Sequence, residues 1–317
     1  MRFRIRFGLA LAALFLGGVP ADAQTPPPAA AAPTPWPTEC RLHPMARFAM
    51  TRNGGHVMVP VMVNGKALNF IIDTGGYAST INADAADALG MKRHGIHLTQ
   101  IRDLGGKNAD SYVVADTFQM GHEMARDFQL MVGAPTKGED GVLAPDLLRN
   151  FDVELDFGTM TMTLFRHHPC SDWAVYWTKA FIALPFTTTD QTHMRISVTL
   201  DGQDARAVVD TGSPGSLLSF ERAEHLFGLD EKSPGVRPLG TIIGGLGSKT
   251  NAYSYPFKSL AMSGVAVANP RILLTAGDNF IENDNASLLL GMDVLHHLHL
   301  YIAYGDNTLY VSGAAAN

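Results

Sequence analysis

Two copies of one tripeptide contain the residues of this chain that could perform acid–base chemistry. Asp73-Thr74-Gly75 follows the apolar run 70–72, and Asp210-Thr211-Gly212 follows the apolar run 207–209. Each copy therefore offers one carboxyl group at the end of an expected buried strand. Two carboxyl groups that face each other can share a proton and activate a water molecule between them. The pair predicts a site of acid–base hydrolysis.

The segments around the two tripeptides are repeated as well. Gly65 and Gly202 each lie eight residues before an aspartate, in a hairpin-like turn between two β-rich runs. These matches have an offset of 137 positions, whereas residues 141–148 match residues 288–295 at an offset of 147. The increase of the offset from 137 to 147 indicates insertions between the matched segments, which we place in loops. One segment of sequence has therefore been used twice, which predicts two lobes that share one interface.

At these residues the chain resembles the pepsin/retropepsin superfamily of aspartic peptidases. The family pattern is two hydrophobic residues and Asp-Thr/Ser-Gly-Thr/Ser, followed much later by two hydrophobic residues and glycine. The second copy matches in full, with Ser213 and Leu289-Leu290-Gly291, but the first copy has Gly76 and Ala144 at the corresponding positions. The resemblance implies an all-β fold of two pseudo-symmetric retropepsin-like acid-protease β-barrel lobes with short helices and an active-site cleft between them.

The resemblance also implies the role of each residue in the tripeptides. Asp73 and Asp210 would be the catalytic residues, placed side by side around one water. The residues that would support the catalytic loops lie in or next to the tripeptides, and they are Thr74, Gly75, Thr211, Gly212 and Ser213. The threonine hydroxyls would hydrogen-bond to the backbone of the opposite lobe, and the glycines would permit a close approach that a Cβ atom would obstruct.

Ser213 suggests which aspartate is ionised. Its hydroxyl would donate to the outer oxygen of Asp210 and favour the charged form, whereas Gly76 has no hydroxyl to offer Asp73. We therefore expect Asp210 to be the ionised member more often and Asp73 to hold the proton.

Two glycine-rich turns between β-like segments are candidate flaps over the substrate. They span residues 102–108 and 243–249, and the glycines that we assign to substrate covering are Gly105, Gly106, Gly244 and Gly245. An extended peptide beneath such hairpins would bind through backbone hydrogen bonds to strand edges. The alternative interpretation is that both turns are simply mobile surface hairpins.

The amino terminus has the features of a secretory signal. Arg2, Arg4 and Arg6 form a basic end, residues 7–19 are apolar, and Ala21-Asp22-Ala23 has the small-residue pattern of a cleavage site. We expect residues 1–23 to be a signal peptide. The protein would then be exported to a periplasm or secreted, with no stable membrane anchor after cleavage.

The remaining sequence divides into four expected parts. Residues 24–43 are a Pro/Ala-rich linker or possible propeptide, 44–168 the N-terminal lobe, 169–184 the connection between the lobes, and 185–313 the C-terminal lobe. Cys40 and Cys170 flank the first lobe. Export favours a disulfide between them, which would clamp the two ends of that lobe, and two unpaired buried thiols are the alternative.

Composition limits the possible partners. The net charge of −6 and the lack of a basic run after the first few residues argue against nucleic acid as a partner. We expect no cofactor and no metal, and we interpret His296, His297 and His299 as part of a partly solvated surface.

The sequence thus predicts an aspartic-type endopeptidase, a hydrolase that acts as a monomer on a peptide or protein substrate. Its water would be activated between Asp73 and Asp210. Two alternatives stay open: a non-catalytic peptide-binding protein of the same fold, and lobes that act through homodimerisation.

Overall fold

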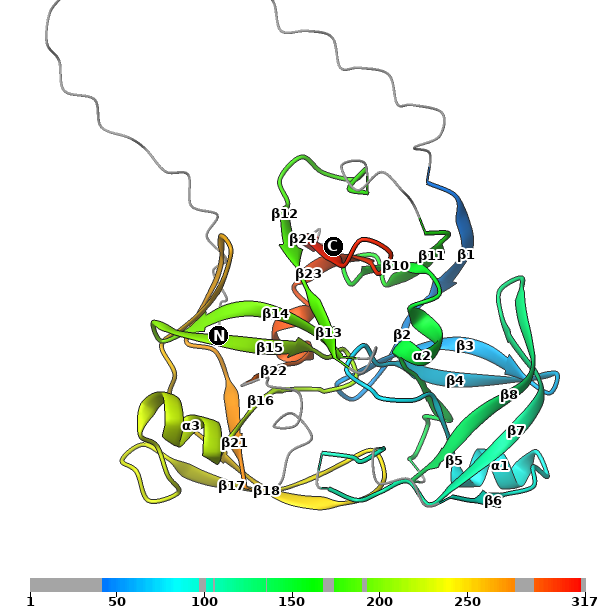
Figure 1. Cartoon of the computed structure of the whole chain (residues 1–317), viewed down its shortest axis with the longest axis horizontal. Coiled ribbons are helices and arrows are strands. Elements are labelled where there is room, and N and C mark those ends of the chain that lie inside the picture. The colour runs from blue at the N-terminus through cyan, green and yellow to red at the C-terminus, as the bar shows by residue number, and fades with distance from the viewer. Residues whose placement is uncertain are drawn as a thin grey trace, which may run out of the picture.

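The computed structural model describes residues 42–96, 101–104, 106–134, 136–167, 174–189, 193–276 and 288–314. The expected signal peptide, most of the expected linker, Gly105 and the expected disulfide partners Cys40 and Cys170 lie outside these residues. Within them β-strands are the main secondary structure, with a few short helices (Figure 1). In this part of the chain no helix combines the length and the apolar character needed to cross a membrane.

Lobe one is built on an eight-stranded sheet. In spatial order its strands are β2 (Thr51–Asn53), β3 (His56–Val63), β4 (Lys66–Ile72), β9 (Gly141–Leu143), β5 (Thr80–Asn82), β8 (Glu123–Gly133), β7 (Ser111–Met120) and β6 (His94–Gly95). A further pairing of β3 with β7 closes the strands between them into a barrel. Two short helices, α1 (Ala83–Ala88) and α2 (Pro145–Leu148), complete the lobe.

Lobe two repeats this plan. Its strands in spatial order are β17 (Arg237–Ile243), β18 (Lys249–Ser254), β21 (Ile272–Thr275), β16 (Ser216–Ser219), β22 (Leu288–Leu290), β15 (Gln203–Val209), β14 (His193–Leu200), β19 (Ser259–Met262) and β20 (Val265–Ala268), with β13 (Thr187–Thr189) paired to β14. Its helices are α3 (Phe220–Phe227) and α4 (Met292–Leu295). The parallel pair β4–β9 of lobe one corresponds to the parallel pair β15–β22 of lobe two.

Local sequence explains the repeated turns and helices. Asn64 and Gly65 have φ values of 49° and 78°, and Asp201 and Gly202 have 44° and 81°. Positive φ at both central residues is the requirement of a type I′ hairpin turn, which Asn-Gly and Asp-Gly satisfy best. The predicted hairpins are thus confirmed, and a short helix, α1 or α3, follows the tripeptide in each lobe.

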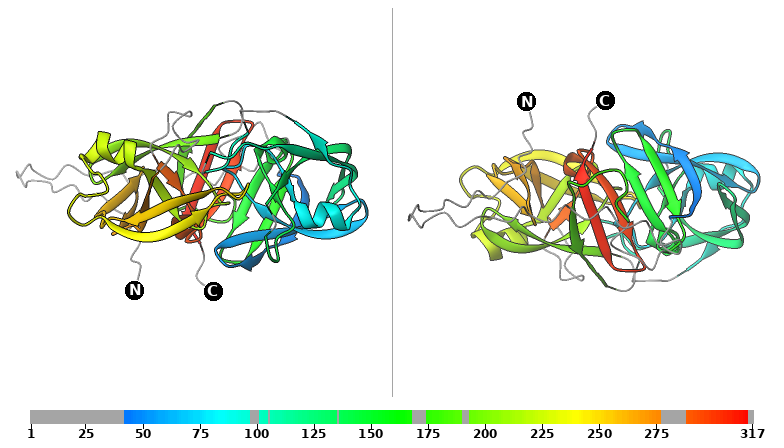
Figure 2. Two further views of the ribbon diagram at one scale, coloured as in Figure 1. Left: turned by 90° about the horizontal axis from the view of Figure 1, so that it is seen from below. Right: turned by 90° about the horizontal axis from the view of Figure 1, so that it is seen from above.

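A six-stranded sheet joins the two lobes. Its order is β1 (Pro44–Ala49), β11 (Thr161–Phe165), β10 (Asp152–Asp156), β23 (Leu298–Ala303), β24 (Thr308–Gly313) and β12 (Ile182–Pro185). Lobe one contributes the first three strands, and the antiparallel pair β10–β23 is the junction. This sheet lies at the top of Figure 1, and the two lobes extend to either side of it in Figure 2.

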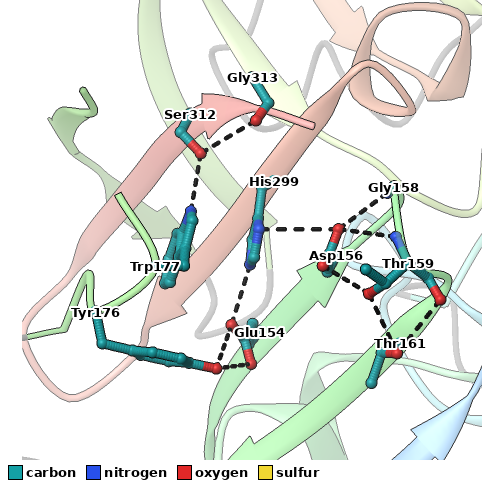
Figure 3. A network of polar contacts seen from close by, with 10 residues as sticks. All are labelled: Glu154, Asp156, Gly158, Thr159, Thr161, Tyr176, Trp177, His299, Ser312 and Gly313. Atoms are coloured by element: carbon teal, nitrogen blue, oxygen red, sulfur yellow. Dashed lines mark hydrogen bonds and ion pairs between the residues drawn. The ribbon is translucent and has the colours of Figure 1, made fainter. Parts of the chain in front are cut away.

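Polar contacts reinforce this junction on one face of the sheet (Figure 3). His299 of β23 lies between two carboxylates of β10, with Nε2 3.0 Å from Glu154 Oε1 and Nδ1 3.8 Å from Asp156 Oδ1. The ring of Trp177 stacks on His299 at a centroid distance of 3.9 Å. Tyr176 donates its hydroxyl to Glu154 at 2.8 Å. The segment around residue 177 is thereby tied to both lobes.

The all-β, two-lobed fold class that the sequence predicts is confirmed, including a barrel-like lobe and a site between the lobes. The expected boundaries of the lobes, the connection and the signal peptide stay predictions.

Candidate active site

Reciprocal hydrogen bonds join the two tripeptides at the ends of β4 and β15. Thr74 Oγ1 donates to Val209 O at 2.7 Å, and Thr211 Oγ1 donates to Ile72 O at 2.7 Å. The amide of each threonine also donates to the hydroxyl of the other, at 3.1 Å in both directions. Both threonines are fully buried. The four bonds hold the two loops in register about a pseudo-twofold axis.

This register places the two aspartates face to face. The amide of Gly75 donates to Asp73 Oδ1 at 3.0 Å, and the amide of Gly212 donates to Asp210 Oδ1 at 2.8 Å. A Cβ atom on Gly75 would lie 2.4 Å from Asp210 Cγ, and one on Gly212 would lie 2.3 Å from Asp73 Cγ. Only glycine leaves room for the opposite carboxyl group, so the tripeptide sequence is required on both sides of the axis.

The two carboxyl groups are hydrogen-bonded to each other and titrate as a pair. Burial raises the pKa of both, and the negative charge of Asp73 raises that of Asp210 further, well above its ordinary value. Burial also raises the pKa of Asp73, but the hydrogen bond from Asp210 and the charge of His56 oppose the rise. The pair therefore keeps one proton over a range of acidic pH.

The predicted role of the Ser213 hydroxyl is wrong. Ser213 Oγ donates to Gly215 O at 2.8 Å, and it is the amide of Ser213 that donates to Asp210 Oδ1, at 3.0 Å. The hydroxyl is engaged within its own loop, so it gives Asp210 no added stabilisation of the charged form. The expectation that Asp210 is the ionised member loses this support and stays a prediction.

The two departures of lobe one from the family pattern are in contact. A Cβ atom on Gly76 would lie 2.7 Å from Asp73 Oδ2 and 3.1 Å from the methyl group of Ala144. In lobe two a side chain is present at Ser213, and the late position is Gly291, which has no room for a Cβ atom. The two lobes thus have glycine and a side chain in exchanged positions, and at Gly291 it is the backbone of Gly215 and Ser213 that excludes a Cβ atom.

In each lobe a serine that follows the tripeptide donates a hydrogen bond to a partly buried aspartate. Ser79 Oγ donates to Asp146 Oδ1 at 2.7 Å, and Ser216 Oγ donates to Asp293 Oδ1 at 2.7 Å. Burial raises the pKa of both aspartates. They lie in the first turns of α2 and α4, and Asp146 accepts the amide of Leu147 there at 3.0 Å.

A cleft of about 990 Å³ opens above the aspartate pair, and both glycine-rich turns contribute to its wall. Lobe two contributes Gly244 and Gly245, as the sequence predicts. Lobe one contributes Ile101 to Leu104, whereas Gly106 turns the tip, with φ 84°, outside the lining. The two turns therefore cover the same cleft from opposite lobes.

The sequence analysis missed two histidines and a glutamate in this cleft. His56 and His193 both line it and are 137 positions apart, the offset of the aspartates, so the repeat itself could have revealed them. His56 Nδ1 lies 2.6 Å from Oε1 of the buried Glu139, and Asn53 Nδ2 donates to the same oxygen at 3.2 Å. A carboxylate can only accept, so Nδ1 bears the proton whenever Glu139 is ionised.

The histidine cluster that follows the late glycine motif is split among different partners. His296 Nδ1 bonds to the carbonyl of Met292, whereas His299 lies in the junction network of Figure 3. Within the described ranges no group of three or more His, Cys, Asp and Glu side chains is arranged to hold a metal ion. His299 is buried rather than solvated, so the expected surface position is wrong for this residue.

Comparison with known proteins gives one family. A sequence model described as aspartyl protease matches residues 59–147 and 196–294, together more than half of the chain. The structure is similar to the crystal structure of an aspartic proteinase from Irpex lacteus, with 11% sequence identity and a TM-score of 0.48 over 85% of this chain and 97% of that chain. No curated protein matches the chain.

Proposed function

The chain belongs to the aspartyl protease family, and from this premise we propose that it is an endopeptidase whose nucleophile is a water molecule activated between Asp73 and Asp210. The observation that carries the proposal is the hydrogen-bonded pair of carboxyl groups beneath the cleft, with the pKa of both raised. Such a pair keeps one proton over a range of acidic pH, because two adjacent charges cannot both form readily.

The shared proton suggests the roles of the two aspartates. The ionised member of the pair would take a proton from the water as it attacks the amide carbonyl. The protonated member would donate a hydrogen bond to the carbonyl oxygen where negative charge develops. A proton would then pass to the leaving nitrogen. The same two groups would serve as base and acid, and no other side chain is needed for the proton transfers.

The cleft suits an extended peptide. The turns of both lobes lie over the aspartates, and a strand-like substrate between them would bind through backbone hydrogen bonds. We propose a peptide or protein substrate, and export of the protein to a periplasm or to the medium. Both aspartates come from one chain, so the pair is complete without a second copy.

Cleavage of a peptide library from acidic to neutral pH tests the proposal. The wild-type chain should cleave, and Asp73→Asn and Asp210→Asn should each abolish cleavage, because base and acid act on the same water. A statine-type mimic of the tetrahedral intermediate should inhibit. Tight binding of that mimic without cleavage at any pH would instead favour the peptide-binding alternative, and a half-active single variant would refute a shared site.

A further inference from the structure

The tips of the two turns over the cleft share two backbone hydrogen bonds. We call them the flap tips, residues 103–107 in lobe one, of which Gly105 lies outside the described residues, and Gly244 to Ser248 in lobe two. The amide of the first residue donates to the carbonyl of the fifth at 3.0 Å in both tips, and the amide of the fourth donates to the carbonyl of the first at 2.8 Å in both. Asp103 and Gly244 therefore occupy equivalent positions.

The carboxylate of Asp103 binds both flap tips. Its Oδ1 accepts the amide of Lys107 in its own tip at 2.9 Å. Its Oδ2 accepts two amides of the opposite tip, Leu246 N at 3.0 Å and Ser248 N at 3.1 Å. The side chain is buried, so three backbone donors replace the water that an exposed carboxylate would bind.

This contact requires the two flap tips to differ. A Cβ atom on Gly244 would lie 2.6 Å from Asp103 Oδ2, so the glycine vacates the space that the carboxylate fills. Aspartates at both positions would collide and repel near the pseudo-twofold axis. One tip must supply the anion and the other must supply the room and the amides.

Each flap tip also rests on the opposite lobe. Leu104 packs against the apolar cluster of Val208, Leu217 and Leu289 in lobe two. In the other direction, Gly245 O accepts the amide of Ala134 in lobe one at 3.2 Å. The contact between the tips thus closes a roof over the aspartate pair. Figure 1 shows the β17–β18 hairpin running along the lower edge of the molecule toward lobe one.

We propose that Asp103 is a positioning residue that clasps the two flap tips together, so that a substrate reaches the aspartate pair only when its hydrogen bonds to Leu246 and Ser248 break. The inference rests on the proposed peptidase function. A roof that must open by breaking these bonds admits a single extended strand more readily than a folded surface loop, which needs a wider opening. The substrate class is accordingly unfolded segments and chain ends.

Amide hydrogen exchange of the full chain tests the clasp without any need for activity. Asp103→Ala should speed exchange at Leu246 and Ser248 at least about tenfold, since a hydrogen bond to a carboxylate is among the stronger ones. Asp116→Ala, which removes the same charge from an exposed position on β7, is the matched control and should leave both amides unchanged. Unchanged exchange in Asp103→Ala would overturn the clasp.

A second variant approaches the same contact from lobe two. Gly244→Ala places a methyl group against Asp103 Oδ2 and against Ser248 Oγ, a hydroxyl that can rotate away, and should also speed exchange at Leu246 and Ser248. In the Asp103→Ala background, the same Gly244→Ala change should add little, because the carboxylate that it displaces is already gone. Fully additive effects of the two changes would overturn a direct contact between these positions.

The proposed consequence for substrates is tested separately. Native lysozyme and reduced, alkylated lysozyme serve as folded and unfolded probes. Wild type should cleave the unfolded form far faster, and Asp103→Ala should lose part of this preference while Asp116→Ala keeps it. Faster exchange with an unchanged preference would overturn control of entry by the clasp. A wild-type chain that cleaves neither probe nor any library peptide would refute the peptidase function, while the exchange data would still decide the clasp.

Discussion

Replacing Thr74 with valine tests whether the tripeptide hydroxyls hold the two lobes together. Valine keeps the shape of the side chain and removes only the hydroxyl group. Thr74 Oγ1 donates to Val209 O at 2.7 Å and accepts the amide of Thr211 at 3.1 Å, and both contacts are buried. The variant therefore takes a partner from one buried carbonyl and from one buried amide.

The expected loss of stability follows from these two groups. A buried polar group left without its partner costs about 1–3 kcal/mol, so two such groups should lower the free energy of unfolding by about 2–6 kcal/mol. Typical domains have a total of about 5–15 kcal/mol. Thr74→Ser is the matched control, because it keeps the hydroxyl and loses one methyl group, at a cost of about 1 kcal/mol.

Urea denaturation followed by far-ultraviolet circular dichroism measures both variants. Thr211→Val should lose as much stability as Thr74→Val, because Thr211 Oγ1 makes the reciprocal contacts, donating to Ile72 O at 2.7 Å and accepting the amide of Thr74 at 3.1 Å. If Thr74→Val were no more destabilising than Thr74→Ser, the hydroxyls would not be the source of the interlobe stability.

Three further predictions concern titration. The pKa of Asp210 is raised in the fold, so this residue lowers the free energy of unfolding once the pH exceeds the unfolded pKa of about 3.9. Asp210→Asn should therefore stabilise the chain against urea at pH 7 but not at pH 3. Asp156 should behave oppositely. Burial raises its pKa, but hydrogen bonds from Thr159 outweigh burial, so the pKa is lowered overall. Asp156→Asn should therefore destabilise the fold at pH 7, and this effect should disappear as the pH falls through the lowered pKa. Equal effects at both pH values would contradict either prediction. His56 lowers the pKa of Asp73, so His56→Gln should move the acidic limb of the pH dependence of kcat/KM to higher pH, and an unmoved limb would refute its influence.

The sequence predicted the parts of the molecule that obey the repeat. The aspartates, the threonines and the hairpin turns all recur at one offset, and physical requirements such as positive φ or contact with the opposite carboxyl fix their residue types. His56 and His193 recur at that offset too and were missed, because neither belongs to a family motif. Repetition at the offset would have been a sufficient signal for them.

Contacts between distant positions were harder to predict. Gly76 and Ala144 read as two independent losses in lobe one, since they lie 68 positions apart in the sequence. Only the structure shows that they lie next to each other, since a Cβ atom on Gly76 would lie 3.1 Å from the methyl group of Ala144. Likewise, nothing in the sequence indicated that the Ser213 hydroxyl bonds to Gly215 within its own loop. A donor can be identified from residue type, but its acceptor depends on loop geometry.

The contact of Asp103 with both flap tips shows why a sequence repeat predicts contacts poorly at the pseudo-twofold axis between the lobes. A duplicated sequence predicts paired, equivalent contacts, and both turns were interpreted as flaps from their shared glycines. A group on the pseudo-twofold axis meets its own counterpart, however, and two identical carboxylates there would overlap and repel. Any side chain that bridges the lobes at the axis must therefore come from a position where the copies differ. Asp103 opposite Gly244 is such a position, so the informative residues at the axis are those that break the repeat.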